Sequence, residues 1–184
     1  DAKCDHIFLM EDDIIIKDKN VFNLYIETAK NTGILHLNYG LHGNHNRDLN
    51  GNPVVRKTIN YPNDTKINLY PNLLGAFSYY HIKCLNEIGL MDEEYYNAME
   101  HVDHTYVASK KGFHPPFRWF ADAHGSEMFL EDIVSDHKES KIRNDQDFQL
   151  IFKKGVDIFI KKHNFSVVGG YGPLEKPYSE NDCL

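Results

Sequence analysis

The chain has 184 residues, 41% of them hydrophobic and 12% aromatic, which predicts one globular domain with a real core rather than a disordered segment. Its formal net charge of -7 argues against nucleic acid as a main partner, because phosphate binding needs a basic surface. No apolar run approaches the roughly 20 residues that cross a bilayer, and the three widely spaced cysteines favour a reducing compartment. We therefore expect a cytoplasmic protein, and peripheral membrane association is also compatible with these numbers.

The first predicted element is a buried strand at 6–11, which leads into three adjacent acids. In the stretch HIFLMEDDIIIKD, Glu11, Asp12 and Asp13 stand between two apolar runs. Because successive side chains of a strand alternate between faces, Glu11 and Asp13 are expected to share one face. Two converging carboxylates suit a hard divalent cation, Mg²⁺ or Mn²⁺. The plainer alternative is a solvated acidic loop.

The next segments predict a βαβ unit with a parallel sheet. Apolar residues recur at helical spacing within 19–31, Gly33 follows as a stop signal, and 34–38 has the composition of a strand. A helix between two strands is the usual connection in parallel sheets. In such sheets, ligands bind beyond the carboxyl ends of the strands, where the acids would lie.

The stretch 39–53 is rich in Gly and Asn and predicts a loop. Its HGNH sequence contains His42 and His45, which could form a metal pair. With no partner in view from the sequence, a solvated loop is the favoured interpretation. A hairpin between 54–60 and 66–70 is expected to follow.

The second half alternates predicted strands and helices. Glycines punctuate it, as a turn at Gly75 and as helix stops at Gly89 and Gly112. The expected elements are a strand starting near 73, helices at 81–88 and 102–111, a strand at 117–123, and a helix at 145–163 with a break risk at Gly155. We assign residues 1–166 to one domain and 167–184 to an irregular tail.

The stretch 75–112 carries an ordered set of glycines, apolar residues and acids: Gly75, Phe77, Leu85, Ile88, Gly89, Asp92, Glu93, Glu100, Asp103 and Gly112. This order resembles inverting glycosyltransferases of the GT-A fold, family-2-like. Their pattern is a strand ending in D-x-D, then G-x-F-x-x-x-R-x-x-L-x-x-I-G-x-F-D-E, then E-D-x-D and a helix ending in Gly. Two positions depart from the pattern. Lys83 stands where Arg is usual, and His101 replaces the acid that is the family's usual catalytic base.

The resemblance implies an α/β fold with a mixed, mainly parallel sheet flanked by helices, as in nucleotide-diphospho-sugar transferases. It also implies that the N-terminal half, whose strands hold the nucleotide, is missing before Asp1. Donor binding would then need that N-terminal segment or a second chain.

The implied activity is metal-dependent, inverting transfer of a sugar from a nucleotide-sugar, expected to be a UDP-sugar, to a saccharide or other hydroxyl acceptor. Asp13 and His137 would ligate the Mn²⁺ or Mg²⁺ ion, while Glu11 and Asp12 would contact the ribose or metal-bound waters. Gly75 would let the backbone approach the sugar closely.

Three residues are candidates for the catalytic base: Glu100, which we prefer, Asp103 and His101. Acids at a helix start are also common for dipole reasons alone. The replacement at His101 and the missing N-terminal half support an alternative function, a carbohydrate- or nucleotide-binding module without catalysis. A divalent-metal phosphoesterase ranks last, because it would need more converging Asp and His ligands.

Overall fold

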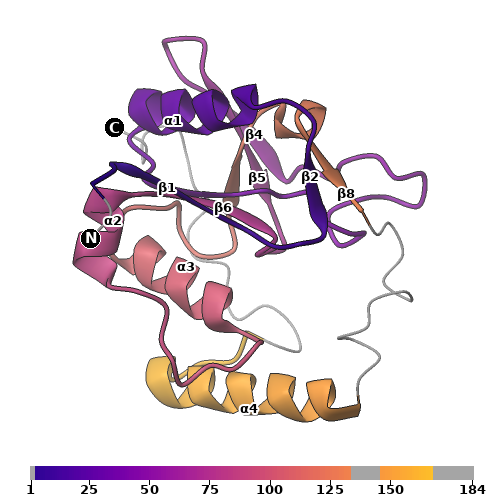
Figure 1. The fold of residues 1–184 in the computed structure, drawn as a ribbon, viewed down its shortest axis with the longest axis vertical. Helices are drawn as coiled ribbons and strands as arrows, with labels where there is room; N and C mark the ends of the chain where they lie inside the picture. The colour runs from indigo at the N-terminus through magenta and orange to yellow at the C-terminus, as the bar shows by residue number, and fades with distance from the viewer. Residues whose placement is uncertain (1–2, 134–145, 168–184) are drawn as a thin grey trace.

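The computed structural model describes residues 3–133 and 146–167, which form eight strands, four α-helices and one 3-10 helix (Figure 1). Their order and bounds are β1 (His6–Met10), β2 (Ile14–Ile16), α1 (Asn20–Thr32), β3 (His36–Asn38), β4 (Lys57–Asn60), β5 (Lys66–Tyr70), β6 (Phe77–His81), α2 (Ile82–Ile88), α3 (Glu100–Lys110), β7 (Phe120–Ala123), η1 (Ser126–Met128), β8 (Leu130–Asp132) and α4 (Gln146–His163).

The strands pair into three small sheets, and every pairing in the described residues is antiparallel. The strand orders are β1-β6-β3, β2-β8 and β4-β5-β7. The predicted GT-A-like fold with a mainly parallel sheet is therefore wrong. β1 and β3, the two strands of the predicted βαβ unit, do run in the same direction. However, β6 lies between them and runs opposite to both.

The central strand β6 is buried on both faces. Phe77 and Tyr79 belong to the main core, whereas Tyr80 packs in a smaller cluster with Cys84. A strand buried on both sides gains most from neighbours at both edges. The sequence predicted a strand in this region, starting near 73, but carried no signal for the direction of its neighbours.

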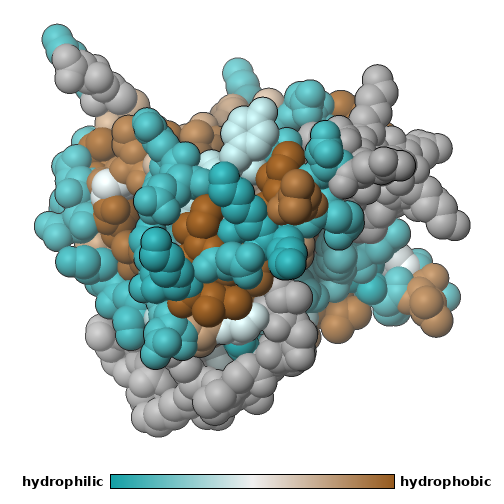
Figure 2. All heavy atoms as spheres, turned by 90° about the horizontal axis from the view of Figure 1, so that it is seen from below, coloured by the Kyte–Doolittle hydropathy of each residue, from teal (hydrophilic) through white to brown (hydrophobic). Residues whose placement is uncertain are grey.

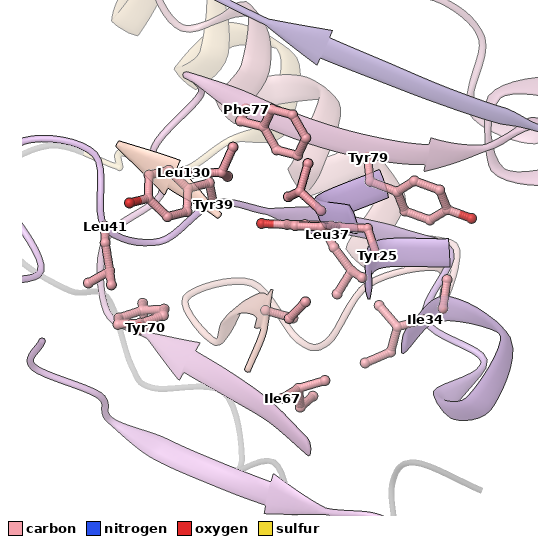
Figure 3. Close-up of a cluster of buried hydrophobic side chains, with 14 of the residues drawn as sticks. Tyr25, Ile34, Leu37, Tyr39, Leu41, Ile67, Tyr70, Phe77, Tyr79 and Leu130 are labelled. Carbon is pink, nitrogen blue, oxygen red and sulfur yellow. The ribbon is translucent and has the colours of Figure 1, made fainter. Parts of the chain in front are cut away.

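The main core lies between α1 and the strands of the first and third sheets (Figure 3). Val21, Tyr25 and Ala29 recur every fourth residue of α1 and are at most 2% exposed. The ring centroids of Tyr25 and Phe77 are 5.2 Å apart. α1 ends at Gly33, whose φ of 75° is the left-handed conformation that glycine adopts readily. The predicted helix and its stop are thus confirmed.

The other predicted helices are confirmed within a few residues. α4, however, runs unbroken through Gly155, so the expected break does not occur. A Cβ at position 155 would lie 2.9 Å from the carbonyl oxygen of Ala98. The glycine therefore serves close packing of α4 against the segment that precedes α3.

The strand predictions were less accurate. The hairpin of β4 and β5 is confirmed, but the expected strand at 117–123 is regular only at β7. Arg118, just before β7, has a φ of 80°, which no extended strand contains. β2 and β8 were not predicted, because three-residue strands are too short to show alternation.

Figure 1 shows α3 below the strands and α4 below α3. Seen from below, the surface consists of hydrophilic side chains around small apolar patches (Figure 2). α4 contributes Leu150 and Ile160, which are 69% and 38% exposed. In the part of the chain described, none of the helices combines the length and apolar character that a membrane crossing requires.

Candidate metal centre

The acidic triplet forms the turn between β1 and β2, not the end of a strand. The turn still brings Glu11 and Asp13 together, as predicted from alternation; Glu11 and Asp12 are exposed, whereas Asp13 is half-buried. Two backbone hydrogen bonds fix its ends. Glu11 N–H donates to Ala76 O at 2.9 Å, and Ile133 N–H donates to Asp13 O at 2.8 Å.

His42, in the loop after β3, brings a third side chain that could ligate a metal ion. One ligand atom each from Glu11, Asp13 and His42 lies within 4.8 Å of the other two. His42 Nε2 is 3.5 Å from Asp13 Oδ2, and His42 Nδ1 is 2.9 Å from Asp132 Oδ1 in β8. Asp13 Oδ1 is buried and has no hydrogen-bond partner. A buried carboxylate oxygen without a donor calls for a cation.

We call Glu11, Asp13 and His42 the acid–histidine cluster. Negative charges lie close together in it and shift the pKa values of Glu11 and His42. Burial raises the pKa of Glu11, and Asp13 adds to this shift, although His101 and His42 oppose it. Burial by itself would lower the pKa of His42. The hydrogen bond to Asp132 and the charges of Asp132 and Asp13 outweigh it, so this pKa is raised. A divalent cation would relieve the same repulsion.

The donor set fits a small divalent ion. Two carboxylates and one imidazole are ligands for Mn²⁺ and other first-row ions, and Mg²⁺ also accepts carboxylates. Because only three side chains converge, part of the coordination sphere of such an ion would remain available for water or phosphate oxygens.

Glu100 and His101, at the start of α3, lie beside the acid–histidine cluster. His101 Nδ1 is 3.1 Å from Glu100 Oε1, and the charges of both residues influence the pKa of Glu11. Burial would raise the pKa of Glu100, but the hydrogen bond and the charge of His101 lower it below its ordinary value. Glu100 Oε2 is buried without a hydrogen-bond partner. Glu100 is thus an ionised carboxylate with one oxygen uncommitted.

Backbone strain immediately precedes Glu100. Asn97 and Met99 have φ values of 56° and 73°, and Met99 is the residue before α3. Such values are costly for residues with a side chain and recur at functional sites. Here they turn the chain so that α3 begins with Glu100.

Gly75 contacts His101 closely. A Cβ at position 75 would lie 2.7 Å from His101 Cγ. The structure therefore gives Gly75 the role of a packing partner for His101, and the expected approach to a sugar stays a prediction.

We predict that Gly75→Ala displaces the His101 ring and lowers the free energy of unfolding by about 1–3 kcal/mol, the usual cost of overpacking. Urea unfolding measures this loss. Removing the ring with His101→Ala should abolish the penalty, so Gly75→Ala should cost little in that background. An equal penalty in both backgrounds would show that the clash involves other atoms.

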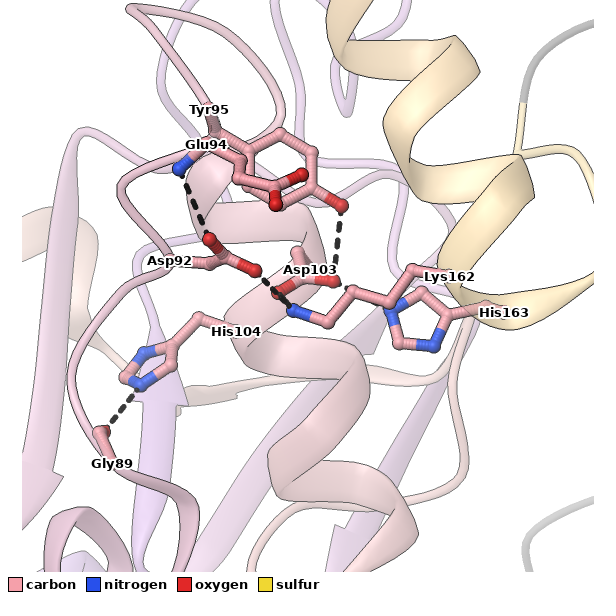
Figure 4. Close-up of polar contacts among 8 residues, drawn as sticks. All are labelled: Gly89, Asp92, Glu94, Tyr95, Asp103, His104, Lys162 and His163. Carbon is pink, nitrogen blue, oxygen red and sulfur yellow. Dashed lines mark hydrogen bonds and ion pairs between the residues drawn. The ribbon is translucent and has the colours of Figure 1, made fainter.

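Asp103, the second candidate base, belongs to a different cluster (Figure 4). It is 2% exposed, and Tyr95 OH donates to its Oδ1 at 3.1 Å. Its carboxylate also pairs with Lys162 at 2.8 Å and His163 at 2.5 Å, both near the end of α4. Both oxygens are therefore engaged in holding α4 against α3, which leaves Asp103 poorly placed to accept a substrate proton.

The remaining site predictions are met unevenly. His137, the expected second metal ligand, lies outside the described residues. His42 was considered only as part of a metal pair with His45, which was not the favoured interpretation, and Asp132 was not predicted as a site residue. HGNH was the available signal for His42, but only the β2–β8 pairing, with Ile14 opposite Asp132, shows that this loop meets the acids.

Comparisons with protein-family models, curated proteins and solved structures find no match. The function is therefore inferred from the chemistry of the acid–histidine cluster and Glu100.

Proposed function

We propose that this chain catalyses metal-dependent, inverting glycosyl transfer from a nucleotide-sugar, with a UDP-sugar as the first candidate donor. The proposal rests on two features that lie close enough to interact electrostatically: Glu11, Asp13 and His42 are arranged so that they could hold a cation, and Glu100 is an ionised carboxylate whose Oε2 has no hydrogen-bond partner. A diphosphate leaving group needs the first feature and an attacking hydroxyl needs the second.

Asp13 and His42 would hold the cation, which when bound would stabilise the negative charge of a departing diphosphate. Glu11 would contact the donor or the water around the ion. Glu100 would accept the proton of an acceptor hydroxyl as its oxygen bonds to the anomeric carbon. The bond from that carbon to the diphosphate breaks, and the electron pair leaves with the nucleotide.

His101 would orient Glu100 through its Nδ1 hydrogen bond. The His101 ring packs closely against Gly75, which leaves no room there for a larger residue. The order of the motifs, from the acidic turn through Gly75 to Glu100, supports the same activity, although the parallel sheet that the resemblance implied is not proposed.

We expect Glu100→Gln to lower turnover of a UDP-sugar by about 100- to 10,000-fold, the usual contribution of a general base. Release of UDP from a panel of UDP-sugars in the presence of Mn²⁺ measures this. Mn²⁺ affinity should fall far less than turnover, because Glu100 acts on the acid–histidine cluster only through its charge and is not one of its three residues. Glu94→Gln is the matched control, since Glu94 is an exposed acid in the segment before α3. Unchanged turnover in Glu100→Gln would remove Glu100 from the mechanism.

A nucleotide-sugar-binding module without catalysis is the second candidate. The observation that favours it is the lowered pKa of Glu100, because a weaker base accepts a proton less readily. Mn²⁺-dependent binding of UDP by the wild-type chain, with no UDP release from any donor of the panel, would establish this function instead.

A further inference from the structure

We propose that Asp132 is a positioning residue that makes His42 a nitrogen ligand and thereby favours a first-row transition ion over Mg²⁺ in the acid–histidine cluster. This inference rests on the metal centre of the proposed function but not on sugar transfer. It starts from the two ends of the His42 ring, which meet two different carboxylates.

The contact of Nδ1 fixes the tautomer of His42. Nδ1 lies 2.9 Å from Asp132 Oδ1, and an ionised carboxylate can only accept a hydrogen bond. Nδ1 therefore carries the hydrogen, and the lone pair of the neutral ring is on Nε2. Nε2 is the atom that faces Asp13 Oδ2, at 3.5 Å. Nε2 of His42 is therefore free to ligate a cation that also contacts Asp13.

Asp132 is itself held firmly. Its Oδ2 accepts the N–H of Gly43 at 2.8 Å, so one carboxylate contacts both the ring of His42 and the backbone that follows it. The Asp132 side chain is 11% exposed and that of His42 is 15% exposed, which limits competition from water. These two contacts prevent the His42 ring from rotating out of the cluster.

The frame beneath these contacts is the short β2–β8 sheet. Asp132 is paired with Ile14, the residue after Asp13, and the Ile133 N–H donates to Asp13 O at 2.8 Å. The strand that carries the ligand Asp13 is thus bonded to the strand that orients the ligand His42. Asp132 is not among the three residues whose ligand atoms converge.

A histidine ligand whose other nitrogen donates to a carboxylate is more basic and better oriented than an unsupported one. Imidazole nitrogen is also a better ligand for first-row transition ions than for Mg²⁺, which prefers oxygen. Loss of the Asp132 contact should therefore cost more affinity for Mn²⁺ than for Mg²⁺.

The test uses Asp132→Asn, because an asparagine can present its amide N–H to Nδ1 and favour the tautomer with hydrogen on Nε2. Mn²⁺ affinity, measured by electron paramagnetic resonance, should fall by about 10- to 100-fold, the usual cost of losing an outer partner. Mg²⁺ affinity, measured by competition against Mn²⁺, should change by far less. Pulsed measurements at saturating Mn²⁺ should show weakened coupling to the histidine nitrogen. Glu131→Gln, a neighbouring exposed acid of β8, is the charge-matched control and should match the wild type.

His42→Ala keeps the proposal falsifiable if Asp132→Asn loosens the fold. In the His42→Ala background, Asp132→Asn should have no further effect on Mn²⁺ affinity, because Asp132 acts through the ring. A further loss there, or an equal loss for Mn²⁺ and Mg²⁺, would overturn the positioning role. No loss in Asp132→Asn would overturn it as well. Failure of the wild-type chain to bind Mn²⁺ would instead remove the metal centre and the proposed function with it.

Discussion

Asp13→Asn is expected to reduce Mn²⁺ affinity by more than the roughly 10- to 100-fold that an outer partner is worth. Asp13 provides an oxygen 3.5 Å from His42 Nε2 and a second, buried oxygen without a hydrogen-bond partner. An asparagine keeps the shape but loses the charge that attracts the ion. Isothermal titration with Mn²⁺, and UDP release from the active donor, should both report the loss.

Asp12→Asn is the matched control for Mn²⁺ affinity. It makes the same change in net charge one residue away, but Asp12 is exposed and outside the acid–histidine cluster. Equal losses of Mn²⁺ affinity in the two variants would mean that the turn attracts cations only through its total charge. The cluster would then not be a coordination site.

Asp122→Asn is expected to raise the free energy of unfolding at neutral and alkaline pH, and this gain should disappear in acid. Asp122, in β7, is fully buried, and burial raises its pKa to about 7, although hydrogen bonds from Tyr25, Gly40 and Ser126 oppose the shift. The folded state therefore keeps a proton that the unfolded state has released between about pH 4 and pH 7. The stability of the wild type should fall as the pH rises through that window.

At pH 3, below the ordinary pKa of 3.8, Asp122 is mostly protonated in both states, so Asp122→Asn and the wild type should unfold at similar urea concentrations. By pH 8 the variant should be more stable by roughly 4 kcal/mol, the cost of ionising this buried carboxyl. Buried histidines such as His36 also destabilise the fold in acid, but they are common to both proteins and cancel in the difference. A variant less stable than the wild type at every pH would show that the three donors stabilise an ionised Asp122.

Local features of the fold were predictable from the sequence, and long-range pairing was not. Helical spacing and Gly33 defined α1, because both signals depend on neighbouring residues. The directions of β1, β3 and β6 depend on contacts across the whole chain. The apolar run of β6 suits a parallel and an antiparallel neighbour equally well, and the parallel choice was wrong.

The candidate site shows the same division. Glu11 and Asp13 were identified because adjacent acids in an apolar stretch require a positive partner. Glu11 and Asp13 were expected to meet on one face of a strand, whereas in the structure a turn brings them together. His42 was interpreted as part of a solvated loop, because its partners Asp13 and Asp132 lie 29 residues before it and 90 residues after it in sequence. No local pattern indicates a contact of that kind.

A crystal of the protein soaked in MnCl₂ with UDP tests the central claim most directly. Anomalous scattering should place one strong Mn²⁺ peak in contact with an Asp13 oxygen and His42 Nε2, with diphosphate oxygens on its open side. A crystal with Mn²⁺ and UDP bound elsewhere, and the acid–histidine cluster free of metal, would contradict the account.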